Sequence, residues 1–233
     1  MNIVCFIFAR GGSQGLKNKN IKILNGKPLI AYSIEKAKKI NLISDIIVST
    51  DSKKIEKISK FYGAKVPFIR PKALSTNNSP EILSWKHAVR HYEKQYQKKI
   101  DIFISLPTTA PLVKSKSVKD ALKLFIKKKT NIDLLLSITE TNHFPQFNMV
   151  YSNKHNLVDL LDKRKSVFSR QKNKNIFNIT TGFYISTPEY IKKCNNYIFN
   201  GIISGYKIKK SESIDIDDIY DFRFAEYLLK NER

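Results

Sequence analysis

The sequence predicts an α/β protein: a three-layer αβα fold around a mostly parallel, doubly wound sheet. Short runs of β-branched and other apolar residues alternate with longer segments in which apolar residues recur every three or four positions. Strands and helices that alternate at these lengths form right-handed βαβ units, which build a parallel sheet with helices on its faces. A glycine-rich basic loop directly follows the first apolar run, at the edge where such sheets bind ligands.

The elements of the N-terminal part follow from this alternation. They are, in order, a strand over 3–7, a helix beginning at Pro28, a strand over 45–50, a helix that Asp51 and Ser52 cap and Gly63 ends, and a short strand over 66–69. Proline suits the first turn of a helix because its φ is fixed and no N–H is needed there. Aspartate and serine accept hydrogen bonds from the unpaired N–H groups at a helix start.

The remainder of the chain continues the alternation and then interrupts it. We predict a helix over 80–97, a strand over 100–106, a helix containing Val118, Leu122 and Phe125, and a strand over 133–139. From about 143 to 178, asparagine, lysine and isolated apolar residues replace the pattern, which resumes with 182–186. Because the interruption keeps apolar residues, we interpret 1–233 as one domain with an inserted arm over about 143–178.

Length and composition bound the class of protein. The 233 residues are 42% apolar, which is enough for a sizeable core. Two cysteines make no disulfide framework, and Cys5, inside the first strand, is expected to pack as a small apolar residue. No run is long enough to span a membrane, and the N-terminal apolar stretch lacks the flanks of a signal peptide. We therefore expect a cytoplasmic protein without a membrane partner.

The formal net charge of +22 raises the question of nucleic-acid binding. The excess is mostly lysine, scattered in pairs and triplets, and abundant asparagine and isoleucine accompany it, as a codon bias toward A and T produces. No single basic tract with interleaved aromatic residues is present. We interpret the charge as compositional drift and expect no specific nucleic-acid partner; a nucleic-acid-binding surface is the alternative.

The loop after the first strand has the composition of a phosphate site. Residues 8–22 read F-A-R-G-G-S-Q-G-L-K-N-K-N-I-K. The glycines allow the backbone to approach an anion, and the cations supply charge for phosphate oxygens. Neither a Walker A ending nor the G-x-G-x-x-G spacing of dinucleotide folds is present. The loop predicts a phosphate site of another kind, with a flexible basic loop as the alternative.

Paired acids stand near the C-terminus, in the segment S-I-D-I-D-D over 213–218. In an extended chain Asp215 and Asp217 lie on one side, while Ile214 and Ile216 face the core. Mg²⁺ binds one or two carboxylates together with phosphate oxygens, so the pair predicts a metal site beside bound phosphates. The alternative is that the acids favour the start of the following helix, a role that suits Asp218.

Five segments, in this order, resemble the acylneuraminate cytidylyltransferase family, the CMP–sialic acid synthetases: A-R-G-G-S-Q-G-L-K-N-K-N-I-K, N-G-K-P-L-I-A-Y-S-I-E-K-A, I-I-V-S-T-D-S, Y-G-A-K-V-P-F-I-R-P and S-I-D-I-D-D-I-Y-D-F. The resemblance runs from Ile3 to Leu229 and is weaker across the arm. It implies a nucleotide-diphospho-sugar transferase-like fold and transfer of CMP from CTP to the anomeric hydroxyl of a nonulosonic acid, a nine-carbon sialic-acid-like sugar acid, with release of pyrophosphate. It also implies Mg²⁺ as cofactor and a homodimer formed through the arm.

The resemblance implies roles by position. The catalytic residues are Arg10, Asp215 and Asp217, of which the two aspartates also bind the metal. The nucleotide-binding residues are Arg10, Gly11, Gly12, Ser13, Gln14, Gly15, Lys19, Asn20, Arg70 and Ser79. The sugar-binding residues are Thr108, Thr109, Arg170, Gln171, Thr180 and Thr181. Arg170 and Gln171 match a pair that reaches a neighbouring active site in similar enzymes.

Three departures from the family pattern bear on the substrate. Gln14 replaces a lysine of the phosphate loop, Pro107 and Val113 replace a glutamine and an arginine, and the stretch 180–182 replaces Asn-Gly-Ala. Because the sugar-reading positions differ, we expect a related bacterial acid such as legionaminic or pseudaminic acid, not N-acetylneuraminate. A Kdo-type cytidylyltransferase and a non-catalytic nucleotide- or nucleic-acid-binding relative are the alternatives.

Overall fold

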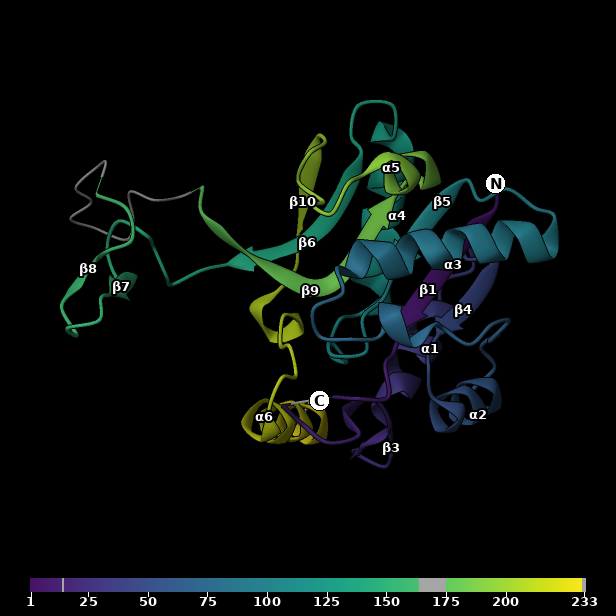
Figure 1. Ribbon diagram of the computed structural model, residues 1–233, viewed down its shortest axis with the longest axis horizontal. Coiled ribbons are helices and arrows are strands. Elements are labelled where there is room, and N and C mark those ends of the chain that lie inside the picture. The colour runs from purple at the N-terminus through teal and green to yellow at the C-terminus, as the bar shows by residue number, and fades with distance from the viewer. Residues whose placement is uncertain (14, 164–174, 232–233) are drawn as a thin grey trace.

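A six-stranded sheet forms the centre of the computed structural model, which describes residues 1–13, 15–163 and 175–231 (Figure 1). Its strands lie in the order β10 (Ile203–Lys207), β6 (Leu134–Glu140), β9 (Phe177–Ser186), β5 (Ile102–Ser105), β1 (Ile3–Phe8) and β4 (Asp45–Ser49). β1 pairs in parallel with β4 and β5, and β10 with β6, whereas β9 runs antiparallel to both of its neighbours. The predicted α/β fold with a mostly parallel sheet is confirmed.

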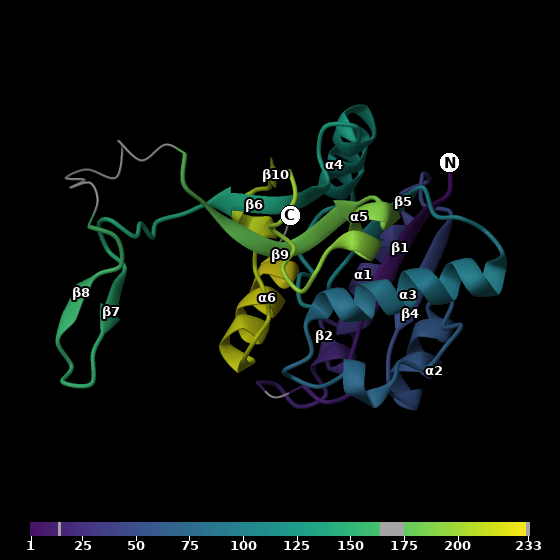
Figure 2. The same cartoon turned by 45° about the horizontal axis from the view of Figure 1, so that its top comes forward.

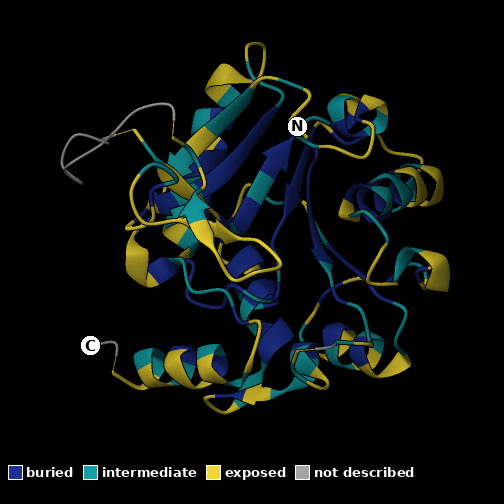
Figure 3. Cartoon of the chain, turned by 60° about the vertical axis from the view of Figure 1, so that its left-hand side comes forward, coloured by how far each residue is buried: buried dark blue, intermediate teal, exposed yellow. Residues whose placement is uncertain are grey.

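Helices cover both faces of the sheet because side chains alternate along its strands. Ile3, Cys5 and Ile7 of β1 face one core, and Val4 and Phe6 face the other. The first core is covered by α1 (Leu29–Lys38), α2 (Lys53–Phe61) and α4 (Ser115–Lys128), and the second by α3 (Glu81–Tyr96) and α5 (Pro188–Lys193) (Figure 2). The buried strands therefore lie between two helical layers, as the dark interior in Figure 3 shows.

The last helix, α6 (Ile219–Asn231), packs away from the two faces of the sheet. It joins a third apolar cluster with the small hairpin of β2 (Ile23–Leu24) and β3 (Lys27–Pro28). Ile216 is buried and Ile214 partly buried in this cluster, as predicted. The packing returns the segment before α6 to the loop after β1, although about 200 residues separate them in sequence.

Helix boundaries agree with the local signals. The side chain of Ser52 accepts a hydrogen bond from the backbone of Ile55 at the start of α2, and Gly63 follows that helix with a φ of 92°. The Oδ1 of Asp218 accepts from the N–H groups of Tyr220 and Asp221 at 2.7 and 3.0 Å. Its predicted capping role is confirmed.

The predicted strand over 66–69 is wrong. The chain meets the sheet edge there only through isolated bridges of Lys65 with Ile47 and of Ile69 with Thr50. Pro67 lies between the two bridges and has no N–H for a ladder, which explains why no continuous strand forms. Our reading of the sequence also did not include α5 or the edge strand β10.

The inserted arm has more structure of its own than expected. It carries a hairpin of β7 (Val150–Ser152) and β8 (Val158–Leu160), which extends away from the sheet in Figures 1 and 2. Leu157 and Val158 are 67% and 65% exposed, whereas Phe144 is buried. Regular pairing with β6 resumes at Phe177 and not at Gly182, because β9 is longer than its apolar pattern suggests.

Both cysteines are free and buried, so Cys5 packs as predicted, and burial raises the pKa of its thiol. Among the described helices, none combines the length and the apolar character needed to cross a bilayer. The chain thus has an apolar core on each face of the sheet.

Candidate active site

A pocket of about 600 Å³ opens at the carboxyl edge of the parallel strands. It is bordered by the loops after β1 and β5, the segment that leads into α3, and the segment that precedes α6. The predicted site residues that line it are Arg10, Ser13, Gly15, Lys19, Asn20, Arg70, Ser79, Thr108, Thr109 and Asp217. Most of the predicted site is therefore one continuous cavity.

The glycines of the loop after β1 serve different purposes. At Gly15 a Cβ would lie 2.4 Å from the carbonyl oxygen of Asp217, so only glycine permits this close approach. The N–H of Gly11 donates to the carboxylate of Asp51 at 2.8 Å and is not free for a phosphate. Gly12 has open space around it, and none of the three has a positive φ.

Asn20 connects the loop after β1 to the loop after β5. It lies in a short 3₁₀ helix, η1 (Lys19–Ile21), and is buried. Its Nδ2 donates to the carbonyl of Arg10 at 2.9 Å, and its Oδ1 accepts from the hydroxyl of Thr108 at 2.5 Å. Both polar ends of Asn20 are thus used by the protein, so we interpret it as a residue that shapes the pocket.

Two side chains of helix α1 donate hydrogen bonds to carbonyls of the loop after β5. The hydroxyl of Ser33 donates to the carbonyl of Pro107, and the Nζ of Lys36 donates to the carbonyl of Ala110, each at 2.8 Å. Lys36 is fully buried, and burial lowers its pKa to about 7. Sequence reasoning missed this support; the available signal was a lysine on the apolar face of a predicted helix.

Asp217 lies at one end of the pocket with an exposed side chain. The Nζ of Lys19 donates to its Oδ1 at 3.1 Å and to the carbonyl oxygen of Ile216 at 2.6 Å. Lys19 therefore neutralises this carboxylate and ties the segment before α6 to the loop after β1. The ion pair joins a predicted phosphate residue to a predicted metal ligand.

Asp215 is more enclosed than Asp217. Burial raises the pKa of its carboxyl, and the nearby charge of Asp217 adds to that effect, while Thr109 and Thr181 act in the opposite direction. One carboxylate oxygen, Oδ1, is buried and has no hydrogen-bond partner among the described residues. Asp215 does not itself line the pocket, but a buried carboxylate oxygen without a partner is costly unless a ligand supplies a donor or a cation.

The donor set around these aspartates fits a metal that arrives with a nucleotide. The described residues contain no group of three or more His, Cys, Asp or Glu side chains that could hold an ion by themselves. Mg²⁺ commonly binds through one or two carboxylates and takes its other ligands from phosphate oxygens and water. The unpartnered oxygen of Asp215 and the exposed carboxylate of Asp217 match that requirement.

The two threonines on β9 differ in availability. β9 leaves regular pairing with β6 between Leu136 and Ile138, and the hydroxyl of Thr180 bonds to the hydroxyl of Ser137 at 2.6 Å. Thr180 therefore stabilises the register shift between β6 and β9 through its bond to Ser137. The hydroxyl of Thr181, by contrast, is buried and has no hydrogen bond of normal geometry to a described residue, but it lies close enough to Asp215 to lower the pKa of that carboxyl.

Arg70 stands at the other end of the pocket. It is buried, and its Nε and Nη1 approach the hydroxyls of Ser75 and Ser84 at 3.0 and 3.5 Å. Burial, and to a smaller extent the like charge of Arg10, lowers the pKa of Arg70. Within the described part of the chain, the buried hydroxyl of Ser79 has no hydrogen-bond partner. This end therefore offers a fixed cation and a free hydroxyl.

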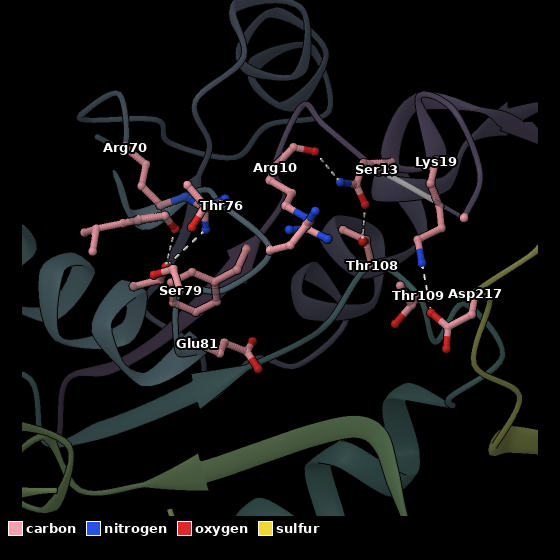
Figure 4. Close-up of a pocket in the computed structure, with 16 residues that line it drawn as sticks. Arg10, Ser13, Lys19, Arg70, Thr76, Ser79, Glu81, Thr108, Thr109 and Asp217 are labelled. Atoms are coloured by element: carbon pink, nitrogen blue, oxygen red, sulfur yellow. Dashed lines mark hydrogen bonds and ion pairs between the residues drawn. The ribbon is translucent and has the colours of Figure 1, made fainter. Parts of the chain in front are cut away.

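Figure 4 shows how these groups are distributed. Arg70 and Ser79 lie at one end of the view, Lys19 and Asp217 at the other, and Arg10 between them. Cations spaced along a cavity, with Asp217 beside Lys19 at one end, suit an elongated polyanion that carries a metal. The pocket thus has the chemistry of a nucleoside triphosphate site.

Among the predicted site residues that the structure describes, five do not line the pocket: Gly11, Gly12, Thr180, Thr181 and Asp215. Gln14, Arg170 and Gln171 lie outside the described residues. The residues of the pocket that sequence reasoning missed come mainly from the segment before α3 and from the first turn of that helix, namely Leu74, Thr76, Asn77, Glu81 and Ser84. The sequence could have indicated them through their closeness in the chain to Arg70 and Ser79, which were both predicted to bind the nucleotide.

Comparison with known proteins agrees with this geometry. Residues 4–230 match the model of the cytidylyltransferase family. The chain is 32% identical over 230 residues to pseudaminic acid cytidylyltransferase of Campylobacter jejuni, covering 99% of this chain and 97% of that protein. It is 30% identical over 227 residues to CMP-N,N'-diacetyllegionaminic acid synthase of Campylobacter jejuni, covering 97% and 94%. The solved structure of CMP:2-keto-3-deoxy-manno-octonic acid synthetase complexed with CTP, at 15% identity, shares the fold over 100% of both chains with a TM-score of 0.72. The chain belongs to the cytidylyltransferase family.

Proposed function

We propose that this chain transfers CMP from CTP to the anomeric hydroxyl of a nonulosonic acid and releases pyrophosphate. The single observation that carries the proposal is the pocket that places Arg10, Lys19 and Asp217 in one cavity with Arg70 and Ser79. Two relatives that match over nearly their full length are named for pseudaminic and legionaminic acids, which favours such an acid over Kdo. The Kdo enzyme supports the fold only.

The residues of the pocket account for the reaction in outline. The anomeric oxygen attacks the α-phosphorus, the bond to the bridging oxygen breaks, and pyrophosphate leaves with the electron pair. Arg10 and Lys19 offset the negative charge that collects on phosphate oxygens. Mg²⁺, held by Asp215 and Asp217 when bound, supplies further positive charge at those oxygens. We place this reaction in the cytoplasm.

The acceptor side has its own free polar groups. The unpartnered Thr181 hydroxyl and Asp215 Oδ1 lie near each other, since Thr181 affects the pKa of Asp215. The buried Asp215 Oδ1 has no hydrogen-bond partner among the described residues and can accept a hydrogen bond from a hydroxyl of the acceptor. We assign Asp215 to orient the anomeric hydroxyl and to accept its hydrogen bond.

The test of the function is pyrophosphate release from CTP in the presence of Mg²⁺ across a panel of sugar acids. We expect release with legionaminic or pseudaminic acid, and much slower release with N-acetylneuraminate and Kdo. Product should be identified as the CMP-sugar by mass spectrometry. Absence of CMP-sugar with every acid of the panel would contradict the proposed function.

We also propose that the chain forms a homodimer through the arm. The hairpin of β7 and β8 extends from the body and exposes Val150, Tyr151, Leu157 and Val158. Exposed apolar side chains on a projecting hairpin favour burial against another surface. A two-fold partner would cover the same patch on both subunits.

The predicted interface can be tested with Leu157→Asp. A carboxylate in a buried apolar contact is unfavourable, so we expect the wild-type dimer to become a monomer. Size-exclusion chromatography with light scattering measures the mass. Phe61→Asp is the matched control, because Phe61 is 85% exposed on α2 and lies outside the arm. A monomeric wild-type protein, or a dimeric Leu157→Asp variant, would contradict this proposal.

A further inference from the structure

One charged group of the pocket has no role in the assignments above. Glu81 is the first residue of α3 and lines the pocket. It makes no ion pair with a described residue, although Arg70 and the indole of Trp85 are close enough to lower its pKa. Figure 4 shows its side chain below Ser79, on the Arg70 side of the view.

The position of Glu81 at a helix start does not by itself explain its surroundings. An acid in the first turn ordinarily points into water, where the helix dipole stabilises its charge. Solvent reaches Glu81 through the pocket, yet the protein encloses it enough that loss of bulk water raises its pKa. A carboxylate in that setting is stabilised when a ligand donates hydrogen bonds to it.

The ligand group nearest to Glu81 follows from the layout of the pocket. The loop after β1, with Arg10 and Lys19, takes the phosphates, and the Arg70 end lies away from Lys19 and Asp217. Phe8 and Leu74 line the same cavity and offer apolar contact to a flat ring. The base of the nucleotide therefore belongs at the end where Glu81 lies.

We propose that Glu81 selects cytosine over uracil by accepting a hydrogen bond from the exocyclic amine of the base. This inference rests on the proposed use of CTP. Cytosine presents an N4–H₂ donor, which acidic side chains accept, whereas uracil presents the O4 acceptor at the same position. With uracil, a carboxylate oxygen of Glu81 would face O4, and both atoms are acceptors. No hydrogen bond can form between them, so UTP is disfavoured.

The experiment measures nucleotide binding without turnover. Calorimetric titration of CTP and UTP, each with Mg²⁺ and without acceptor, gives the CTP/UTP affinity ratio for wild type, Glu81→Gln and Glu189→Gln. Glutamine can turn its amide to donate to O4, so we expect Glu81→Gln to lower the ratio about tenfold or more. Glu189 is the matched control, because it also follows a proline at a helix start and is exposed, but does not line the pocket.

Two results would overturn the proposal. One is a wild-type protein that binds CTP and UTP equally. The other is a Glu81→Gln variant with an unchanged CTP/UTP affinity ratio. Unchanged thermal unfolding of both variants shows that they fold. Because binding needs no sugar, the ratio tests Glu81 even if no acid of the panel reacts.

Discussion

Asp217→Asn is expected to lower turnover by at least about 100-fold, a loss typical of removing one main electrostatic element from an active site. Asparagine keeps the shape of the side chain but removes the charge that pairs with Lys19 at 3.1 Å and that a metal needs. Initial rates of pyrophosphate release at saturating CTP and acceptor measure the effect. Chelation of divalent ions by EDTA should abolish activity, and added Mg²⁺ or Mn²⁺ should restore it.

The neighbouring acid supplies the control for this substitution. Asp218 caps α6 and does not line the pocket, and asparagine caps helices as well as aspartate does. Asp218→Asn should therefore retain nearly native turnover. A near-native Asp217→Asn enzyme, or full activity in EDTA, would remove Asp217 from the assignment as a metal ligand.

Local signals in the sequence were sufficient for most of the elements and for most of the pocket. Ser52 and Asp218 cap their helices as predicted because capping depends on a few consecutive residues. Most of the loop after β1 could be assigned because glycines and cations after a buried strand have few other uses. The strand predicted over 66–69 from its apolar residues does not form, because Pro67 has no N–H to donate to a neighbouring strand.

Other features depend on contacts that no local pattern contains. The need for glycine at position 15 arises from the carbonyl of Asp217, about 200 residues away in sequence. The antiparallel direction of β9 and the use of Thr180 by Ser137 follow from how two strands pair, which periodicity does not report. The sequence pattern predicts Glu81 as part of a helix, and only the folded chain brings that position to the pocket.

The second large effect is expected for Arg10→Ala. Arg10 lies between the two ends of the pocket, and Asn20 fixes its backbone through a 2.9 Å hydrogen bond to its carbonyl. Because the guanidinium meets charge that develops on phosphate, its loss should lower kcat by about 100-fold or more. KM for the sugar acid should change only a few-fold, since the acceptor groups around Thr181 and Asp215 remain.

Two further variants separate the charge of Arg10 from its shape and from the general charge of the chain. Arg10→Lys keeps the positive charge but loses the planar fork that binds two phosphate oxygens, so it should recover only part of the lost rate. Arg90→Ala removes an exposed arginine of α3 outside the pocket and should leave kcat unchanged. If Arg10→Ala altered only the KM for the sugar acid, Arg10 would contact the acceptor. In a chain with a net charge of +22, a large loss confined to Arg10 would show that catalysis depends on where a cation stands and not on how many there are.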